Sequence, residues 1–134
     1  MITHRRFHRA VFLLAGLYNI GWGLFSALDP QWVFRRSGMP ESNHPEIFAC
    51  LAMVVGVYGL LYLEVARAPE RGWPIAAVGL LGKILGPAGM LALVAAHRWP
   101  LSAAAIITVP NDLIWWIPFA LYLRDARGFY RAQS

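Results

Sequence analysis

The chain is poor in the residues that soluble redox and hydrolytic enzymes use. Its 134 residues include one cysteine, seven acidic side chains and four histidines, and only 14% of them are charged. Cys50 has no CxxC motif and no second cysteine to resolve a sulfur intermediate, which excludes thiol–disulfide catalysis. We expect Cys50 to pack as a small apolar side chain, because unpaired cysteine is usually buried.

The histidines do not suit a haem buried in a membrane, which needs two axial ligands near the middle of the bilayer. All four histidines fall at the ends of hydrophobic stretches. His44, Glu46 and His97 share one side of the predicted membrane, but they lack the tight spacing of a metal site, and solvation at the membrane surface explains them. We therefore assign no metal and no cofactor to the sequence.

Hydrophobic residues, by contrast, make up 58% of the chain, more than a single soluble core of this size can bury. They form four stretches of about the 20 residues needed to cross a bilayer, with short connections between them. These stretches are residues 10–28, 47–65, 73–96 and 102–123. The sequence therefore predicts an all-α fold, an integral membrane four-helix bundle formed as one domain by residues 1–134. In the longest loop we expect a short interfacial helix at Trp32, Val33 and Phe34.

The arginines predict the orientation of the bundle. Eight lie on the side that holds both termini and the middle connection, namely Arg5, Arg6, Arg9, Arg67, Arg71, Arg124, Arg127 and Arg131. The other side has three, Arg35, Arg36 and Arg98. By the positive-inside rule both termini are then cytoplasmic. The net charge of +5 is explained by topology and lipid headgroups, so we expect membrane lipids as partners and no nucleic acid.

Two charged residues, Lys83 and Asp112, lie inside stretches that otherwise resemble lipid-spanning helices. Lys83 is ten residues from Trp73 and Asp112 is eleven from Leu101, or about 15 Å and about 16 Å along a helix. Both are therefore near the midplane of a hydrocarbon layer about 30 Å thick. A lone charge at that depth costs about 2.5–3.5 kcal/mol, so such residues are either paired or functional.

Other polar residues fall at a similar depth in the first and second stretches, and a bundle that keeps polar atoms away from lipid brings them together. Helical spacing also places two tryptophans near Asp112. We therefore predict a midplane ligand pocket formed by Asn19, Tyr58, Lys83, Thr108, Asn111, Asp112, Trp115 and Trp116. Pro87 lacks an amide hydrogen, so the carbonyl of Lys83, four residues earlier, needs another partner at membrane depth.

The sequence leaves two interpretations of this polar layer open. In the first, Lys83 and Asp112 form a buried salt bridge that fixes how the third and fourth helices pack. In the second, they line a site that is open to a lipid-soluble ligand or to protons. Gly79, Gly82 and Gly86 leave one side of the third stretch bare, which suits either a ligand or a close helix contact.

Three segments carry a resemblance to known proteins: CLAMVVGVYGLLYLEVAR, WPIAAVGLLGKILGPAGML and NDLIWWIPFALYL. They resemble a group of small bacterial four-span membrane proteins labelled alkyl hydroperoxide reductase, and the N-terminal GLYNIGWGLFSALDPQWVFRRSGMP is similar to the same group. The chain also resembles, more loosely, DoxX-like proteins, which are four-helix bundles. The resemblance implies a multi-pass protein of a bacterial inner membrane. Peroxide reduction needs a reactive thiolate, normally with a resolving cysteine, and Cys50 alone in an apolar helix does not supply it.

Three functions follow from these patterns. We favour a non-catalytic one, in which the polar pocket binds a lipid-, quinone- or isoprenoid-like molecule and the protein acts as an accessory subunit of a larger membrane system. The alternative is a membrane enzyme or proton-coupled carrier that uses Asp112 as acid or base. The third is a purely structural protein that forms a homo-oligomer through Gly79, Gly82 and Gly86. We assign no catalytic residue.

Overall fold

The computed structural model describes residues 2–133, and within that range every regular element is a helix. Four helical runs are long and apolar enough to cross a membrane, which confirms the predicted all-α fold with four long hydrophobic helices. The elements in chain order are α1 (Arg5–Leu28), α2 (Trp32–Arg36), α3 (Pro45–Arg67), α4 (Trp73–Ala95), α5 (Leu101–Asn111), the 3-10 turn η1 (Leu113–Trp115) and α6 (Trp116–Gln133). The short helix α2 occupies the loop position where the sequence predicts one.

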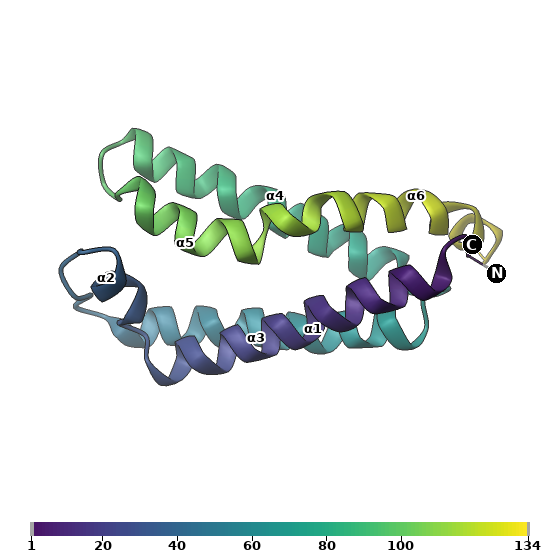
Figure 1. Ribbon diagram of the computed structural model, residues 1–134, viewed down its shortest axis with the longest axis horizontal. Helices are drawn as coiled ribbons and strands as arrows, with labels where there is room; N and C mark the ends of the chain where they lie inside the picture. The colour runs from purple at the N-terminus through teal and green to yellow at the C-terminus, as the bar shows by residue number, and fades with distance from the viewer. Residues whose placement is uncertain (1, 134) are drawn as a thin grey trace.

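The long helices form two side-by-side pairs, one of α1 with α3 and the other of α4 with the run from α5 to α6 (Figure 1). Both chain ends lie at one end of the bundle together with the α3–α4 connection, while α2 and the α4–α5 connection lie at the other (Figure 1). This is the arrangement expected for a chain with an even number of spans.

The first pair is held together by glycines that let two backbones touch. A Cβ added at Gly59 would lie 2.6 Å from the carbonyl oxygen of Gly16, and one added at Gly23 would lie 2.7 Å from the carbonyl oxygen of Ala52. Real Cβ atoms do not approach backbone this closely, so only glycine fits. Small residues in such seams are the usual way for helices to pack in lipid, where no hydrophobic force drives them together.

Aromatic rings join the two pairs in the half of the bundle nearer the chain ends. Phe12 of α1 lies against Phe119 and Tyr122 of α6, with ring centroids 4.5 Å and 4.8 Å away. Tyr62 of α3 meets Phe119 edge-on at 5.1 Å. All four rings are fully buried, and the Tyr122 hydroxyl donates to the carbonyl oxygen of Pro69 at 2.6 Å.

The outer surface of the bundle is apolar, with many large hydrophobic side chains exposed, among them Leu14, Leu24, Ile47, Leu85 and Ile117. Cys50 is also exposed, so our expectation that it packs inside the protein was wrong. The reason is rotational: an apolar helix can turn a small apolar residue outward at little cost when its surroundings are themselves apolar.

The fourth predicted span, residues 102–123, is interrupted rather than continuous. α5 ends at Asn111, and Asp112 has φ −125° and ψ −61°, outside the helical region. Pro110 and Pro118 flank the break, and Pro110 removes an amide donor from the helical ladder of α5. Pro118 falls in the first turn of α6, where its missing amide hydrogen would have no helical partner anyway. The interruption therefore places Asp112 at a gap in the helical backbone.

Candidate functional site

A cavity of about 380 Å³ opens among α1, α3, α4 and α5. Its wall is mostly apolar, with residues such as Val54, Met90 and Ile107. The cavity brings together six of the eight residues predicted to form a pocket, namely Asn19, Tyr58, Lys83, Thr108, Asn111 and Asp112. The polar residues that the sequence places at one depth thus share one space in the fold.

Lys83 is almost completely buried, at 5% exposure, and its ammonium does not form an ion pair with Asp112. Instead, Lys83 Nζ donates to the backbone carbonyl of Asn111. That carbonyl lies at the end of α5, and the amide four residues later, on Trp115, donates to the carbonyl of Asp112 at 3.0 Å. The break in the fourth helical run therefore creates the acceptor that Lys83 uses.

Aromatic rings surround the rest of the Lys83 ammonium. Its Nζ lies 5.5 Å from the ring centroid of Tyr62, 5.7 Å from that of Phe119 and 6.0 Å from that of Trp115. Cation–π attraction at these distances stabilises a cation that water does not reach. One carbonyl and three rings thus stabilise the Lys83 ammonium without a contact to Asp112.

The carboxylate of Asp112 borders the cavity without a hydrogen bond to any residue that the structure describes. It faces Gly86 of α4, where an added Cβ would lie 3.2 Å from Asp112 Oδ2. Glycine at this position therefore leaves room for the carboxylate. A half-buried carboxylate beside a cavity can accept a proton, or a hydrogen bond from the hydroxyl group of a bound molecule.

Two residues of the same wall carry buried amide oxygens without a partner. Asn19 Nδ2 donates to the carbonyl of Val55 at 3.2 Å, and Asn111 Nδ2 donates to the carbonyl of Ile107 at 2.8 Å. The Oδ1 atoms of both side chains have no partner among residues 2–133. Buried polar atoms left without a partner are rare, because each costs roughly 1–3 kcal/mol. The two oxygens are therefore the most informative groups in the cavity.

The two predicted tryptophans lie beside the cavity and outside the set of residues that line it. Trp116 Nε1 donates to the carbonyl of Lys83 at 2.8 Å, the carbonyl that Pro87 leaves without its helical partner. Trp115 Nε1 donates to the carbonyl of Pro110 at 2.9 Å. Both indoles bond to backbone carbonyls, and neither presents its N–H to the cavity. Thr108 likewise bonds to its own helix, donating to the carbonyl of Ala104 at 2.8 Å.

Sequence reasoning missed two aromatic residues of the wall, besides its apolar ones. Trp22 of α1 lies three residues after Asn19, and its buried Nε1 has no partner within the described part of the chain. Tyr62 of α3 lies four residues after Tyr58 and also lines the cavity. Spacings of three and four residues put side chains on one helix face, so this signal was present in the sequence.

The fold and the site define an all-helical chain whose four membrane-length helices enclose a cavity with a few polar groups. Comparison of the chain with protein-family models, with curated proteins and with solved structures finds no match.

Proposed function

We propose that this chain is a multi-pass protein of a bacterial inner membrane, with both termini in the cytoplasm, that binds a lipid-, quinone- or isoprenoid-like molecule in its midplane cavity. Four membrane-length helices and an apolar outer surface support insertion in a bilayer. The excess of arginine on the side of the chain ends supports the orientation.

The size and polarity of the cavity suit a lipophilic ligand with a small polar head. Sites for small molecules are typically about 300–1,000 Å³, mostly apolar, with a few placed polar groups, and this cavity of about 380 Å³ falls within that range. Its apolar wall would take part of a hydrocarbon chain. Gly82 has no atom within 4 Å of an added Cβ, so the α4 side of the wall is open.

The observation that carries the proposal is the pair of unpartnered amide oxygens on Asn19 and Asn111. They accept hydrogen bonds, as does the carboxylate of Asp112, whereas the unpartnered Trp22 Nε1 donates one. A head group that complements this set carries hydroxyl donors and at least one acceptor. Within the proposed class, a quinol, an isoprenoid alcohol or an acylglycerol fits better than a fully oxidised quinone, which has acceptors only.

Two leucine substitutions on α4 test the proposal. Gly82 and Gly89 both have open space around an added Cβ, but only Gly82 lines the cavity. Protein is purified in mild detergent, and the co-extracted lipids are identified by mass spectrometry. We expect one species enriched over bulk membrane lipid with the wild type and with Gly89→Leu, and its loss with Gly82→Leu. Only bulk lipid with the wild type, or equal enrichment with both variants, would overturn the proposal.

A further inference from the structure

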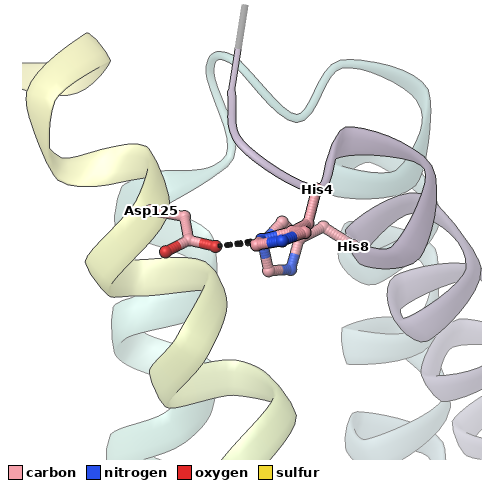
Figure 2. A group of neighbouring side chains, drawn as sticks. All are labelled: His4, His8 and Asp125. Atoms are coloured by element: carbon pink, nitrogen blue, oxygen red, sulfur yellow. Dashed lines mark hydrogen bonds and ion pairs between the residues drawn. The ribbon is translucent and has the colours of Figure 1, made fainter.

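A second group of chemically active side chains lies at the end of the bundle that holds both chain ends, away from the midplane cavity. His4 and His8 come from the start of α1, and Asp125 comes from α6 (Figure 2). His8 Nε2 lies 2.9 Å from Asp125 Oδ2, and His4 Nδ1 lies 3.4 Å from the same oxygen. One potential ligand atom from each residue lies within 4.8 Å of the other two.

These separations are close to those that a bound transition metal would impose. A tetrahedral cation with nitrogen and oxygen ligands at about 2.0–2.2 Å holds its ligand atoms about 3.3–3.6 Å apart. The His4–Asp125 distance is already in that range, and the His8–Asp125 distance is a few tenths of an ångström shorter. The nitrogens of His4 and His8 lie within 4.8 Å of each other, so these two side chains have to move closer together by up to about 1.5 Å to place one cation among the three atoms.

Asp125 and His8 are shielded from solvent, unlike a pair of side chains on a solvated surface. The side chain of His8 is 1% exposed and that of Asp125 is 7% exposed. Arg124 Nε donates to Asp125 Oδ1 at 2.9 Å, which leaves Oδ2 directed at the histidines. Carboxylate ligands of metals are commonly held in this way by an outer hydrogen bond.

His4 adopts a backbone conformation that places its ring at the cluster. Its φ of 55° and ψ of 33° are left-handed, a region that residues other than glycine seldom occupy. Although His4 is the N-cap residue of α1, its side chain makes no capping hydrogen bond and lies beside Asp125 instead. At 65% exposure, the His4 side chain leaves one side of the cluster open to solvent.

We propose that His4 Nδ1, His8 Nε2 and Asp125 Oδ2 bind one divalent transition-metal ion, with Zn²⁺ as the representative, and that the fourth position is open on the His4 side. Two imidazoles and one carboxylate suit first-row divalent metals such as Zn²⁺ and Co²⁺ and do not suit Mg²⁺ or Ca²⁺, which prefer oxygen ligands alone. His8 Nδ1 is buried without a partner among the described residues, so the site lacks the usual outer support for that ligand. We therefore expect weaker binding than in a closed structural zinc site.

We predicted no metal from the sequence, where the histidines lie at span ends without tight ligand spacing. His8 and Asp125 are 117 residues apart, and His4 and Asp125 are 121 apart. Ligand spacing along the sequence reveals a site when the ligands lie on one helix or loop, and here only the two histidines do. The cluster forms only when α6 packs beside α1 (Figure 2).

The test uses the full chain in detergent micelles, prepared without a histidine tag and stripped of metal with EDTA. Titration with Co²⁺ is followed through its visible absorption, which is strong for four-coordinate Co²⁺ and weak for the hydrated ion. We expect one Co²⁺ per chain and its displacement by Zn²⁺. No binding to the wild type at micromolar metal would overturn the proposal.

Variants assign the binding to this cluster. We expect His4→Ala to weaken Co²⁺ affinity at least about tenfold and Asp125→Asn to abolish the absorption. His44→Ala is the matched control, because His44 is an exposed histidine beside a carboxylate, Glu46, at 3.2 Å. Its affinity should equal that of the wild type. Since His4 is exposed, its alanine variant should retain the helical circular dichroism, and it decides the outcome if Asp125→Asn does not fold. Unchanged affinity in His4→Ala, or loss in His44→Ala, would overturn the assignment.

Discussion

Pro87 removes an amide donor from the middle of α4, and the indole of Trp116 supplies the missing hydrogen bond. The acceptor is the carbonyl of Lys83, which lies 2.8 Å from Trp116 Nε1. Trp116→Phe keeps an aromatic ring but leaves this carbonyl without a donor. An unpartnered buried polar group costs roughly 1–3 kcal/mol in soluble proteins, whereas hydrogen bonds between membrane helices average about 0.6 and reach about 1.7 kcal/mol. Because lipid offers the carbonyl no replacement donor, we expect a loss near the upper membrane value, about 1.5 kcal/mol.

A double-mutant cycle with Pro87→Ala separates this hydrogen bond from the lost ring area. Alanine restores a backbone amide four residues after Lys83, so the carbonyl regains its helical partner. In the Pro87→Ala background we therefore expect Trp116→Phe to cost about 1 kcal/mol less than in the wild type. Trp115→Phe is the control, because its indole donates to Pro110 and its cost should be the same in both backgrounds.

The assay is reversible unfolding of the detergent-solubilised protein by increasing SDS, followed by far-ultraviolet circular dichroism. The free energy of unfolding is compared across the wild type, the two single variants and the double variant. If Trp116→Phe lowers the free energy of unfolding equally with and without Pro87, the reasoning is refuted. Pro87 would then not be the reason that the Lys83 carbonyl needs the indole as its donor.

Two further predictions concern the α1–α3 seam and the end of the bundle that holds both termini. Gly59→Ala places a Cβ 2.6 Å from the carbonyl oxygen of Gly16, so the SDS unfolding free energy should fall by roughly 1–3 kcal/mol. Gly21→Ala, with open space around it, should be neutral or slightly stabilising, and equal losses would contradict the seam. The Arg5 guanidinium beside Glu70 holds the pKa of that carboxyl below its usual range. The stabilisation by this pair is then complete above the usual glutamate pKa of about 4.3 and fades as pH falls through the lowered folded value. The free energies of unfolding of the wild type and Glu70→Gln, taken from thermal melts, should differ by less than about 1 kcal/mol above that pH and become equal in acid. A constant difference down to pH 2 would contradict a stabilising Arg5–Glu70 pair.

The helices and the depth of their polar residues follow from the sequence because both depend only on position along the chain. A helix advances about 1.5 Å per residue, so counting residues from a span end gives the depth of Asn19, Lys83 and Asp112 directly. The freed carbonyl at Lys83 also follows, since the absence of an amide at Pro87 is a covalent fact. The structure places the three polar residues around one cavity and provides the carbonyl with a donor.

The hydrogen-bond partners of these polar residues do not follow from their depth. The partners depend on how each helix is rotated about its axis and on the break in the helix at Asp112. Lys83 and Asp112 are at one level, yet the lysine bonds to the carbonyl of Asn111, which only the end of α5 makes accessible. Rotation also decides that Cys50 lies outside the bundle. No count along an apolar helix fixes its rotation, since lipid accepts almost any apolar side chain.

The cavity and the histidine–aspartate cluster both lie between the α1–α3 pair and the pair formed by α4 with the run from α5 to α6, and this shared location bears on the ligand that we propose. Within the α1–α3 pair the backbones touch at Gly16 and Gly59, so these two helices cannot separate without losing their closest packing. Between the pairs, side chains make the contact. Aromatic rings pack together near the chain ends, and the cavity lies farther along the bundle. Movement of the two pairs as units would therefore widen the cavity and keep the α1–α3 packing intact. A metal ion at His4, His8 and Asp125 would join α1 to α6 at the outer end of the aromatic rings. It would then limit separation of the pairs at the chain ends and act less on the cavity, which lies farther along the bundle beside Asn19 and Asn111.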